Sequence, residues 1–540
     1  MIGDRKAHRR RARRQTGETI DKRHYIHCRG GRLGGNADTA AADVDDIVTA
    51  LRADTRGHLI LYFHVGLVTR KAGLEIAERL TPLCLGGGHP VFYVWESGAW
   101  ETIRNNLLEL AEEPVFKQLL RKPLEYTINR IGGVSAARSI VPGNVDPQKV
   151  KEAVDKFFAN PSKQTVPYRD LEAAAKRGAA RSSAISVDEA EIQADLQSDV
   201  EFAQALAKLP DLKPSTRSAL GGAVVAERRS PFSEAVDDKV SEGPGGRGIV
   251  AWFKVAMMVK DILVNVLRRH GSSRDHGLYA TVVEEIVREV KLGGSGLNEW
   301  GKALQWNRMK QDTMDAFGPD ENVHAGTALL ARLKRAVDDS YALRRISLIG
   351  HSTGAIYIAH WLDMAKALLP PPAQFDVLLL APAITYQRFD ECLTRHQARI
   401  GHFRMFCMRD PLERDDQVWG EDGELEAQHD WRRFIYPSSL LYLVSGILES
   451  TGQGGDLKDV PDMPLLGMER FHALREIYAD TDFPELKRVR AWLDAEPGRI
   501  VWSKAEGQGD GLNSGSFDHG AFDNDTDTVA SLVSVLSRRF

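Results

Sequence analysis

The chain has 540 residues, of which 43% are hydrophobic and 27% are charged, and its formal net charge is −4. This length allows two or three domains, or one core that carries a large insertion. The near-neutral charge gives no bulk electrostatic reason to expect a nucleic-acid partner. The four cysteines are scattered without C-x-x-C spacing, which argues against a disulfide framework and a structural zinc site. That pattern suits a reducing compartment, so we expect a cytoplasmic protein.

Two segments raise the question of a membrane surface. Residues 1–22 are basic and are not followed by an apolar run, so they resemble neither a secretory nor an export signal. They fit a solvated tail, or a segment attracted to anionic lipid or nucleic acid. Residues 249–267 are apolar but interrupted by Lys254, Lys260 and Asp261. They predict a buried helix or, alternatively, an interfacial helix that makes peripheral membrane contact, and no stretch predicts a membrane-spanning helix.

Strand and helix patterns alternate in the first part of the chain, over residues 23–100. Short apolar runs at 25–28, 59–63 and 90–95 predict buried strands. Residues 38–54 and 73–84 have the spacing of amphipathic helices. This alternation predicts a parallel sheet and the first half of an α/β core.

The alternation lapses over residues 101–335, which are mostly helical in pattern. Residues 165–247 within this stretch are rich in Ala, Ser, Asp and Glu and close with Gly243-Pro244-Gly245-Gly246, a flexible composition. We interpret 101–335 as a large, mainly helical insertion, part of it loosely ordered.

The second half of the core, residues 336–540, resumes the alternation. A strand at 345–349 leads into a helix at 355–369, and further strands are expected along the chain, with a closing helix at the end. These are strands at 377–380, 403–408 and 499–502, and a helix at 526–536.

The most informative motif is Gly350-His351-Ser352-Thr353-Gly354, between the strand at 345–349 and the helix at 355–369. A serine with glycines two residues to either side, between a strand and a helix, is the pattern of a nucleophile elbow. The turn is so sharp that side chains at the flanking positions would clash. Ser352 is therefore a candidate nucleophile at the carboxyl end of a central strand.

A serine nucleophile needs a base, and the base needs an acid that orients it. In elbow proteins the chain order is serine, acid, histidine. Among the histidines after Ser352, only His519 lies in a loop between the last strand and the closing helix, so it is the candidate base. The acid should follow the strand at 403–408, where we favour Asp410, with Asp416 and Glu413 as alternatives.

The developing negative charge needs two backbone N–H donors. One is expected from Thr353, directly after the nucleophile. The other is expected from Val65 or Gly66, in the loop after the strand at 59–63. His64 in that loop could shape it by hydrogen bonding without taking part in chemistry.

These segments resemble the α/β-hydrolase superfamily of serine esterases and lipases. The resemblance covers roughly 58–98 and 340–540, including Phe63-His64-Val65-Gly66, Phe92–Gly98 and His519–Phe522, and is to bacterial members with a large helical insertion. It implies an α/β-hydrolase fold, a mostly parallel sheet flanked by helices, with the insertion before the nucleophile strand. It also implies Ser352 as nucleophile, His519 as base, Asp410 as acid, and Thr353 with Val65 as oxyanion donors. Val65 stands where many members have glycine, which narrows the backbone options of the loop.

We therefore expect a serine hydrolase that acts on a small-molecule or lipid carboxylic ester. An acyltransferase that uses the same acyl-enzyme is an alternative, as is a non-catalytic interaction module that keeps the fold. The triad chemistry requires no cofactor, and neither a phosphate-binding loop nor a metal-ligand cluster is visible in the sequence.

Overall fold

A computed structural model describes most of the core of the chain and part of the insertion. The described residues are 20–96 apart from 36 and 67, 114–131, 152, 187–207, 249–292, 306–416 apart from 371 and 372, 436–449 apart from 437, and 462–538 apart from 480 and 482. The basic residues 1–19 and Gly243-Pro244-Gly245-Gly246 lie outside them. Within 165–247, the described part forms two helices, α8 (Glu189–Ser198) and α9 (Val200–Ala207).

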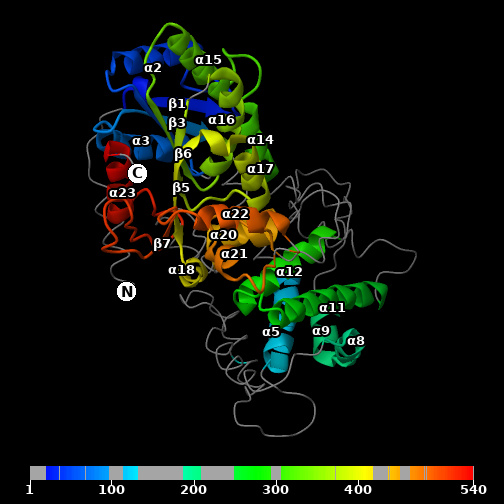
Figure 1. Ribbon diagram of the computed structural model, residues 1–540. Helices are drawn as coiled ribbons and strands as arrows, with labels where there is room; N and C mark the ends of the chain where they lie inside the picture. Colours follow the sequence, from blue (N-terminus) through cyan, green and yellow to red (C-terminus); the bar gives the residue numbers. More distant parts are fainter. Residues whose placement is uncertain are drawn as a thin grey trace, which may run out of the picture.

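A seven-stranded sheet forms the centre of the molecule (Figure 1). Its strand order is β1-β3-β2-β4-β5-β6-β7, and every neighbouring pair is parallel. All six residues of β2 and of β5 are buried, as expected for strands covered on both faces. The strands are β1 (Tyr25–Arg29), β2 (His58–Phe63), β3 (His89–Glu96), β4 (Arg345–His351), β5 (Phe375–Leu380), β6 (Ile400–Met408) and β7 (Ile500–Ser503). The predicted strands and the parallel α/β architecture are confirmed.

Helices cover both faces of this sheet. Successive strand residues point to opposite faces, so Phe63 stacks on Tyr357 of α16 while Tyr62 contacts the layer formed by α3 and α23. Helices α14, α15 and α17 lie beside α16, and α2 lies beside α15. The bounds are α2 (Ala41–Ala53), α3 (Arg70–Cys84), α14 (Trp306–Asp315), α15 (Ala325–Asp338), α16 (Gly354–Leu368), α17 (Tyr386–His396), α22 (Pro484–Asp494) and α23 (Thr526–Arg538).

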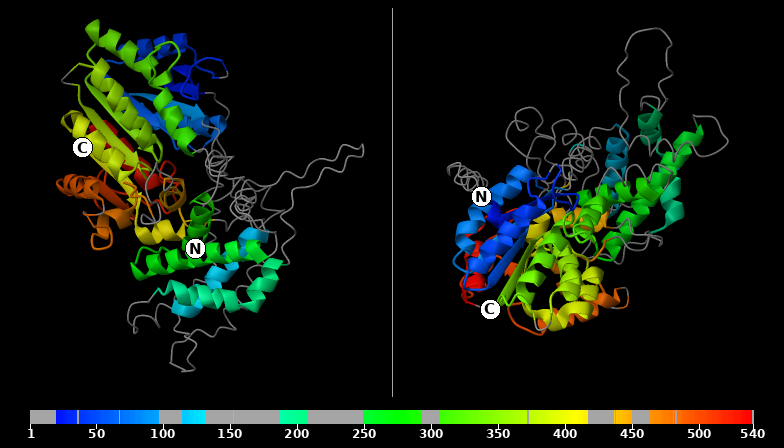
Figure 2. Two further views of the ribbon diagram at one scale, coloured as in Figure 1. Left: turned by 90° about the vertical axis from the view of Figure 1, so that its right-hand side faces the viewer. Right: turned by 90° about the horizontal axis from the view of Figure 1, so that it is seen from above.

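Within 101–335, the described helices up to residue 292 form a bundle beside the core (Figures 1 and 2). Helices α14 and α15 were expected to belong to the insertion as well, but they pack on α16 of the core. Helix α11 (Ile249–Gly271) packs against α5 (Pro114–Ile131), α8, α9 and α12 (Leu278–Leu292). Its residues Val259, Ile262 and Leu263 are buried in this bundle. The apolar pattern at 249–267 therefore forms a buried helix, the first of the two structures that the sequence allowed. Among the described helices, none has the length and apolar content that spanning a bilayer would require.

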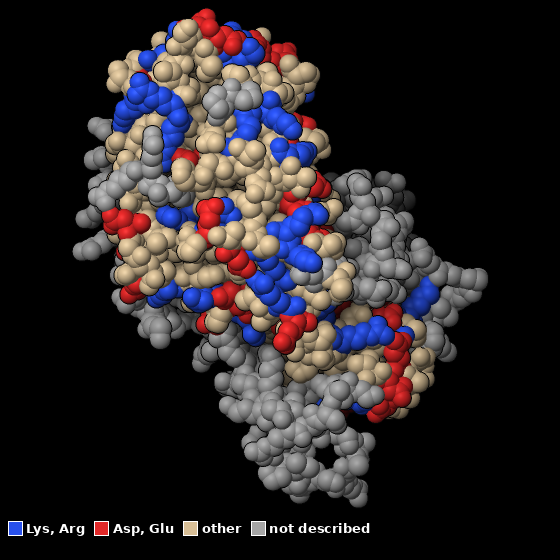
Figure 3. Space-filling model, viewed as in Figure 1, with Lys and Arg blue, Asp and Glu red and all other residues tan. Residues whose placement is uncertain are grey.

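Short helices near the carboxyl edge of the sheet were not predicted. They are α18 (Asp410–Asp415), α20 (Leu440–Leu443), the π-helical segment η4 (Val444–Leu448) and α21 (Glu469–Ala473), with the 3₁₀ turns η1 (Lys22–His24) and η2 (Gln397–Arg399) elsewhere. A helix of four to six residues shows too little periodicity to be found in a sequence. On the face shown in Figure 3, basic and acidic side chains are interspersed, in keeping with the small net charge.

Candidate active site

Ser352 occupies the turn between β4 and α16, at the carboxyl edge of the sheet. Its φ is 54°, a left-handed value that costs a non-glycine residue about 1–3 kcal/mol. A Cβ atom at Gly354 would lie 2.2 Å from the carbonyl oxygen of Phe63. One at Gly350 would lie 2.8 Å from the backbone carbonyl carbon of Gly354. Both flanking positions therefore require glycine, and the strained turn expected of a nucleophile elbow is present.

The backbone and the hydroxyl of Ser352 are in opposite situations. Its N–H donates to Leu380 O at 2.8 Å, and its carbonyl oxygen accepts from Ala383 N–H at 3.1 Å. Its hydroxyl has no hydrogen-bond partner among the described residues, although Ser352 is only 1% exposed. Buried polar atoms almost always have a partner. The backbone is thus fixed, while the hydroxyl is left for chemistry.

The predicted oxyanion donors lie beside this serine. Gly66 N–H donates to Thr353 Oγ1 at 2.7 Å, which joins the loop after β2 to the start of α16. A Cβ at Gly66 would lie 2.3 Å from the ring of Trp95, so only glycine fits there. No described residue accepts a hydrogen bond from the N–H of Thr353 or of Val65. The N–H groups of Thr353 and Val65 are therefore available to a substrate oxygen, whereas the N–H of Gly66 is already bound to Thr353 Oγ1.

His64 holds this loop in shape. Its Nδ1 lies 2.6 Å from Val65 O, and its Nε2 accepts from Trp95 N–H at 3.1 Å. Its ring also stacks on the Trp95 indole. Burial lowers the pKa of His64 to about 4, so the ring is neutral and donates only through Nδ1. Both ring nitrogens are used by backbone groups, which fits a role in shaping the loop.

The peptide of His519 is held from both sides. Its N–H donates to Asp416 Oδ2 at 2.9 Å. Its carbonyl oxygen lies 2.9 Å from Nε2 of His351, the residue before the candidate nucleophile. The loop that follows β7 is therefore tied both to the elbow and to the end of α18.

The imidazole of His519 is buried and unpaired among the described residues. Neither ring nitrogen has a hydrogen-bond partner, and its ring centroid lies 5.7 Å from that of His351. Burial, with a further contribution from His351, lowers the pKa of His519 well below its ordinary value. The ring is therefore neutral near pH 7, the form that a general base requires. Ser352 and His519 are brought to one place, but no hydrogen bond joins their side chains.

The three candidate acids lie on or directly after α18, and the structure separates them. Asp410 Oδ1 accepts from the hydroxyl of Tyr442 at 2.5 Å, and Asp410 N–H donates to Glu469 Oε2 at 2.8 Å. Asp416 is 7% exposed and is the one of the three that makes a hydrogen bond to His519.

Glu413, the third candidate, is 1% exposed, and neither carboxyl oxygen has a hydrogen bond of ordinary geometry. Burial raises its pKa well above the usual range; the nearby Ser439 hydroxyl opposes this shift, and Asp416 adds to it. A carboxyl group whose charged form is disfavoured by burial is poorly suited to stabilise an imidazolium. The contacts therefore favour Asp416 over Asp410 and Glu413 as the partner of His519.

Sequence reasoning did not single out His351. It is 1% exposed, contacts the carbonyl of His519, and meets the ring of Phe522 edge-on. Its position inside the motif was a usable signal, because parallel strands end at the same edge of the sheet, so the last residue of β4 and the loop after β7 both lie at that edge.

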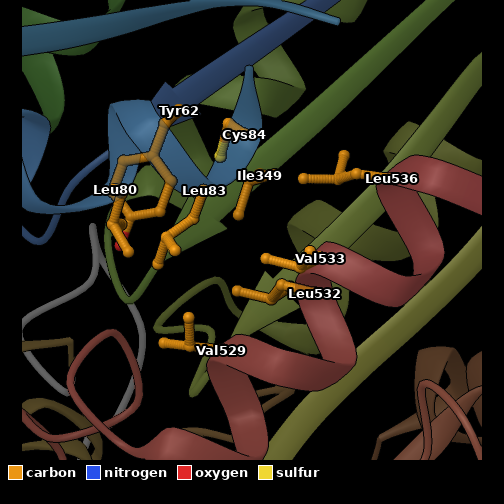
Figure 4. Close-up of a pocket in the computed structure, with 9 residues that line it drawn as sticks. All are labelled: Tyr62, Leu80, Leu83, Cys84, Ile349, Val529, Leu532, Val533 and Leu536. Atoms are coloured by element: carbon orange, nitrogen blue, oxygen red, sulfur yellow. The ribbon is translucent and has the colours of Figure 1, made fainter. Parts of the chain in front are cut away.

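Two further features of the described part of the chain bear on other possible sites. No group of three or more His, Cys, Asp or Glu side chains there could hold a metal ion. A small apolar pocket lies between the sheet, α3 and α23 (Figure 4). It is lined by Tyr62, Leu80, Leu83, Cys84, Ile349, Val529, Leu532, Val533 and Leu536, none of which is a candidate site residue.

No protein-family model matches the chain, and no curated protein or solved structure has significant similarity to it.

Proposed function

We propose that this protein is a serine hydrolase of the α/β-hydrolase fold that cleaves a carboxylic ester through an acyl-enzyme. The observation that carries the proposal is the left-handed φ of Ser352 at a glycine-flanked turn, beside a histidine loop tied to His351 and Asp416. The order along the chain also agrees: the serine follows the central strand β4, the acids follow β6 and the histidine follows β7.

In this mechanism Ser352 Oγ attacks the acyl carbon, and the neutral imidazole of His519 takes its proton. The N–H groups of Thr353 and Val65 stabilise the negative charge on the tetrahedral oxygen. Asp416 orients the imidazole and stabilises its cation. The protonated His519 then donates to the leaving alkoxide, and water attacks the acyl-enzyme with His519 again as base.

The mechanism requires the imidazole of His519 to rotate until one ring nitrogen faces Ser352 Oγ and the other faces the Asp416 carboxylate. Catalytic hydrogen bonds are often long or absent without substrate and form in the complex. Asp416 Oδ2 is already bound to the N–H of the same residue, so its carboxylate lies within reach of the ring. We therefore propose Asp416 as the acid instead of Asp410, which is engaged by Tyr442.

Two features bear on the substrate and on the second half-reaction. The buried apolar face of α11 removes one reason to expect contact with lipid, so an ester of either a small molecule or a lipid fits the proposal. The burial of Ser352 favours, as a second candidate, transfer of the acyl group to an alcohol or amine, because exclusion of water decides between hydrolysis and transfer.

The test is covalent labelling with a fluorophosphonate probe, with and without phospholipid vesicles. The parent protein and a Ser347→Ala variant should be labelled, because Ser347 is a buried serine in the interior of β4. Ser352→Ala should not be labelled. A folded parent that stays unlabelled in both conditions would contradict the proposal and favour the interaction module.

A labelled parent then separates hydrolysis from transfer. Release of free acid from a nitrophenyl ester in buffer alone would support the hydrolase. Product formation only when a nucleophilic alcohol is added would support the acyltransferase.

A further inference from the structure

A buried polar cluster joins the insertion to the core, and Glu284 of α12 is at its centre. Glu284 is fully buried, and its Oε2 accepts from Nη1 of Arg269 on α11 at 2.6 Å. Its Oε1 accepts from the hydroxyl of Tyr436 at 2.5 Å and lies 3.2 Å from Nε2 of His276. Burial alone would raise the pKa of Glu284, but His276 and Arg269 outweigh it and lower this pKa to about 2. The insertion thus presents a buried carboxylate to the core.

The core backbone is shaped around this carboxylate. Gly446 lies in the π-helical segment η4, and a Cβ there would be 2.2 Å from Glu284 Oε1. A π-helical turn is rare and widens the helix locally, so it is kept where a structural or functional need exists. Glycine at this position allows the backbone to approach the carboxylate closely. The backbone of η4 therefore packs directly against the Glu284 carboxylate, and glycine at position 446 makes this approach possible.

The cluster continues from Glu284 to α18. The His276 ring stacks on that of Tyr442, with 4.1 Å between centroids. The hydroxyl of Tyr442 donates to Asp410 Oδ1 at 2.5 Å. A second contact runs from Arg414 Nε on α18 to His276 O at 2.9 Å. His276, which contacts Glu284, is therefore connected to α18 in two ways, through the ring of Tyr442 and through its own carbonyl oxygen.

Asp410 begins α18 and Asp416 directly follows its last residue. A helix of six residues has little stability of its own, so its direction is decided by what holds its ends. The start is held by Tyr442 and Glu469, and the end by the N–H of His519.

We infer that Glu284 anchors the helical insertion to the core and thereby positions α18, with Asp416 at its end, against the loop of His519. Glu284 is a positioning residue: it touches none of the reacting groups. The insertion is then a fixed support of the site. The catalytic consequence rests on the proposed function, whereas the anchoring does not.

The test compares Glu284→Gln with Glu285→Gln in the full chain. Glu285 is the neighbouring buried residue of α12 and also accepts from Arg269, at 3.0 Å, but it has no hydrogen bond or ion pair with the core among the described residues. In Glu284→Gln, Arg269 still has Glu285 as a partner, which limits the loss of stability. A third variant, Tyr442→Phe, removes the hydroxyl that donates to Asp410 and accepts from Nη1 of Arg470 at 3.0 Å.

Hydrogen exchange of the amides in residues 410–416 is the first readout. We expect exchange about tenfold faster in Glu284→Gln and in Tyr442→Phe, and unchanged in Glu285→Gln, because a lost hydrogen bond to a charged group shifts a local opening equilibrium by about that factor. Equal exchange in all three variants and the parent would overturn the inference, as would an equal increase in both α12 variants.

The second readout is the rate of fluorophosphonate labelling at Ser352. It should fall about tenfold in Glu284→Gln and stay within about twofold of the parent in Glu285→Gln. If the parent is not labelled at all, the proposed function fails, and the exchange experiment still decides whether Glu284 anchors α18.

Discussion

The two edges of the same sheet each bring a serine, a histidine and an aspartate together, with different results. At the amino edge, the hydroxyl of Ser347 lies 2.9 Å from Nε2 of His58 and 3.4 Å from Oδ2 of Asp376. At the carboxyl edge, neither the hydroxyl of Ser352 nor the ring of His519 has a partner among the described residues. By hydrogen-bond distance alone, the amino edge looks more like a catalytic group.

The difference lies in what surrounds each serine. Ser347 is in the interior of a regular strand, and Asp376 contacts the serine and Arg345 instead of orienting the base. His58 donates from Nδ1 to Gly87 O at 2.8 Å, so no carboxylate stands behind it. Ser352, in contrast, is held in a strained turn at the start of a helix, near backbone donors. A serine whose hydroxyl already has hydrogen-bond partners stabilises the fold. A nucleophilic serine needs a fixed backbone and a hydroxyl that is still available to the base and the substrate.

The largest effect that tests this contrast is the replacement of each histidine by glutamine. His519→Gln should reduce fluorophosphonate labelling by about 10³-fold or more, because the serine loses its base. His58→Gln should label at nearly the parental rate. The measurement is the second-order labelling rate constant. Comparable losses of labelling in both variants would mean that His58 matters for labelling as much as His519, and would contradict the contrast between the two edges.

The second comparison concerns the acids near α18. Asp416→Asn should reduce the labelling rate by about 10²–10³-fold, since the imidazolium loses its stabilising charge. Asp410→Asn should cost about tenfold, because it weakens only the hydrogen bond from Tyr442 that holds α18. The reverse order of effects would return the role of acid to Asp410.

The strain at the elbow can be tested through stability. Gly354→Ala should lower the free energy of unfolding by about 2–3 kcal/mol, because its Cβ would be 2.2 Å from the Phe63 carbonyl. Gly86→Ala is the matched control, since a Cβ there meets nothing within 4 Å. Urea denaturation of the two variants gives the difference, and an unchanged midpoint for Gly354→Ala would refute the close approach.

The smallest expected effect is the pH dependence at the amino edge. Burial lowers the pKa of His58 to about 4 in the folded protein, while the unfolded chain has the ordinary value near 6.5. Below pH 6.5 the unfolded state binds more protons, so stability falls as the pH falls toward 4. Between pH 7.5 and 5.5, His58→Gln should lose about 1 kcal/mol less than the parent in urea denaturation, and an identical loss in both proteins would contradict this.

The sequence alone was sufficient for features that depend on neighbouring residues. The apolar runs predicted all seven described strands, because a strand buried on both faces needs continuous apolar side chains. The spacing of the glycines at 350 and 354 around Ser352 predicted the turn, and the clash avoided at Gly350 is with the elbow's own residues, although the one avoided at Gly354 is with Phe63 of β2. His519 could be selected because few histidines follow the serine and only one lies in the appropriate loop.

Only the tertiary structure could separate the acids. Asp410, Glu413 and Asp416 lie within seven residues at the end of one strand, so no local pattern ranks them. Their partners, Tyr442 and His519, lie far along the chain, and chain folding alone decides which carboxylate each partner meets. The same holds for Glu284, whose partner Tyr436 in the core is 152 residues further along the chain. Local sterics and apolar patterning are written in short stretches of sequence, whereas hydrogen bonds between distant segments exist only once the fold has brought them together.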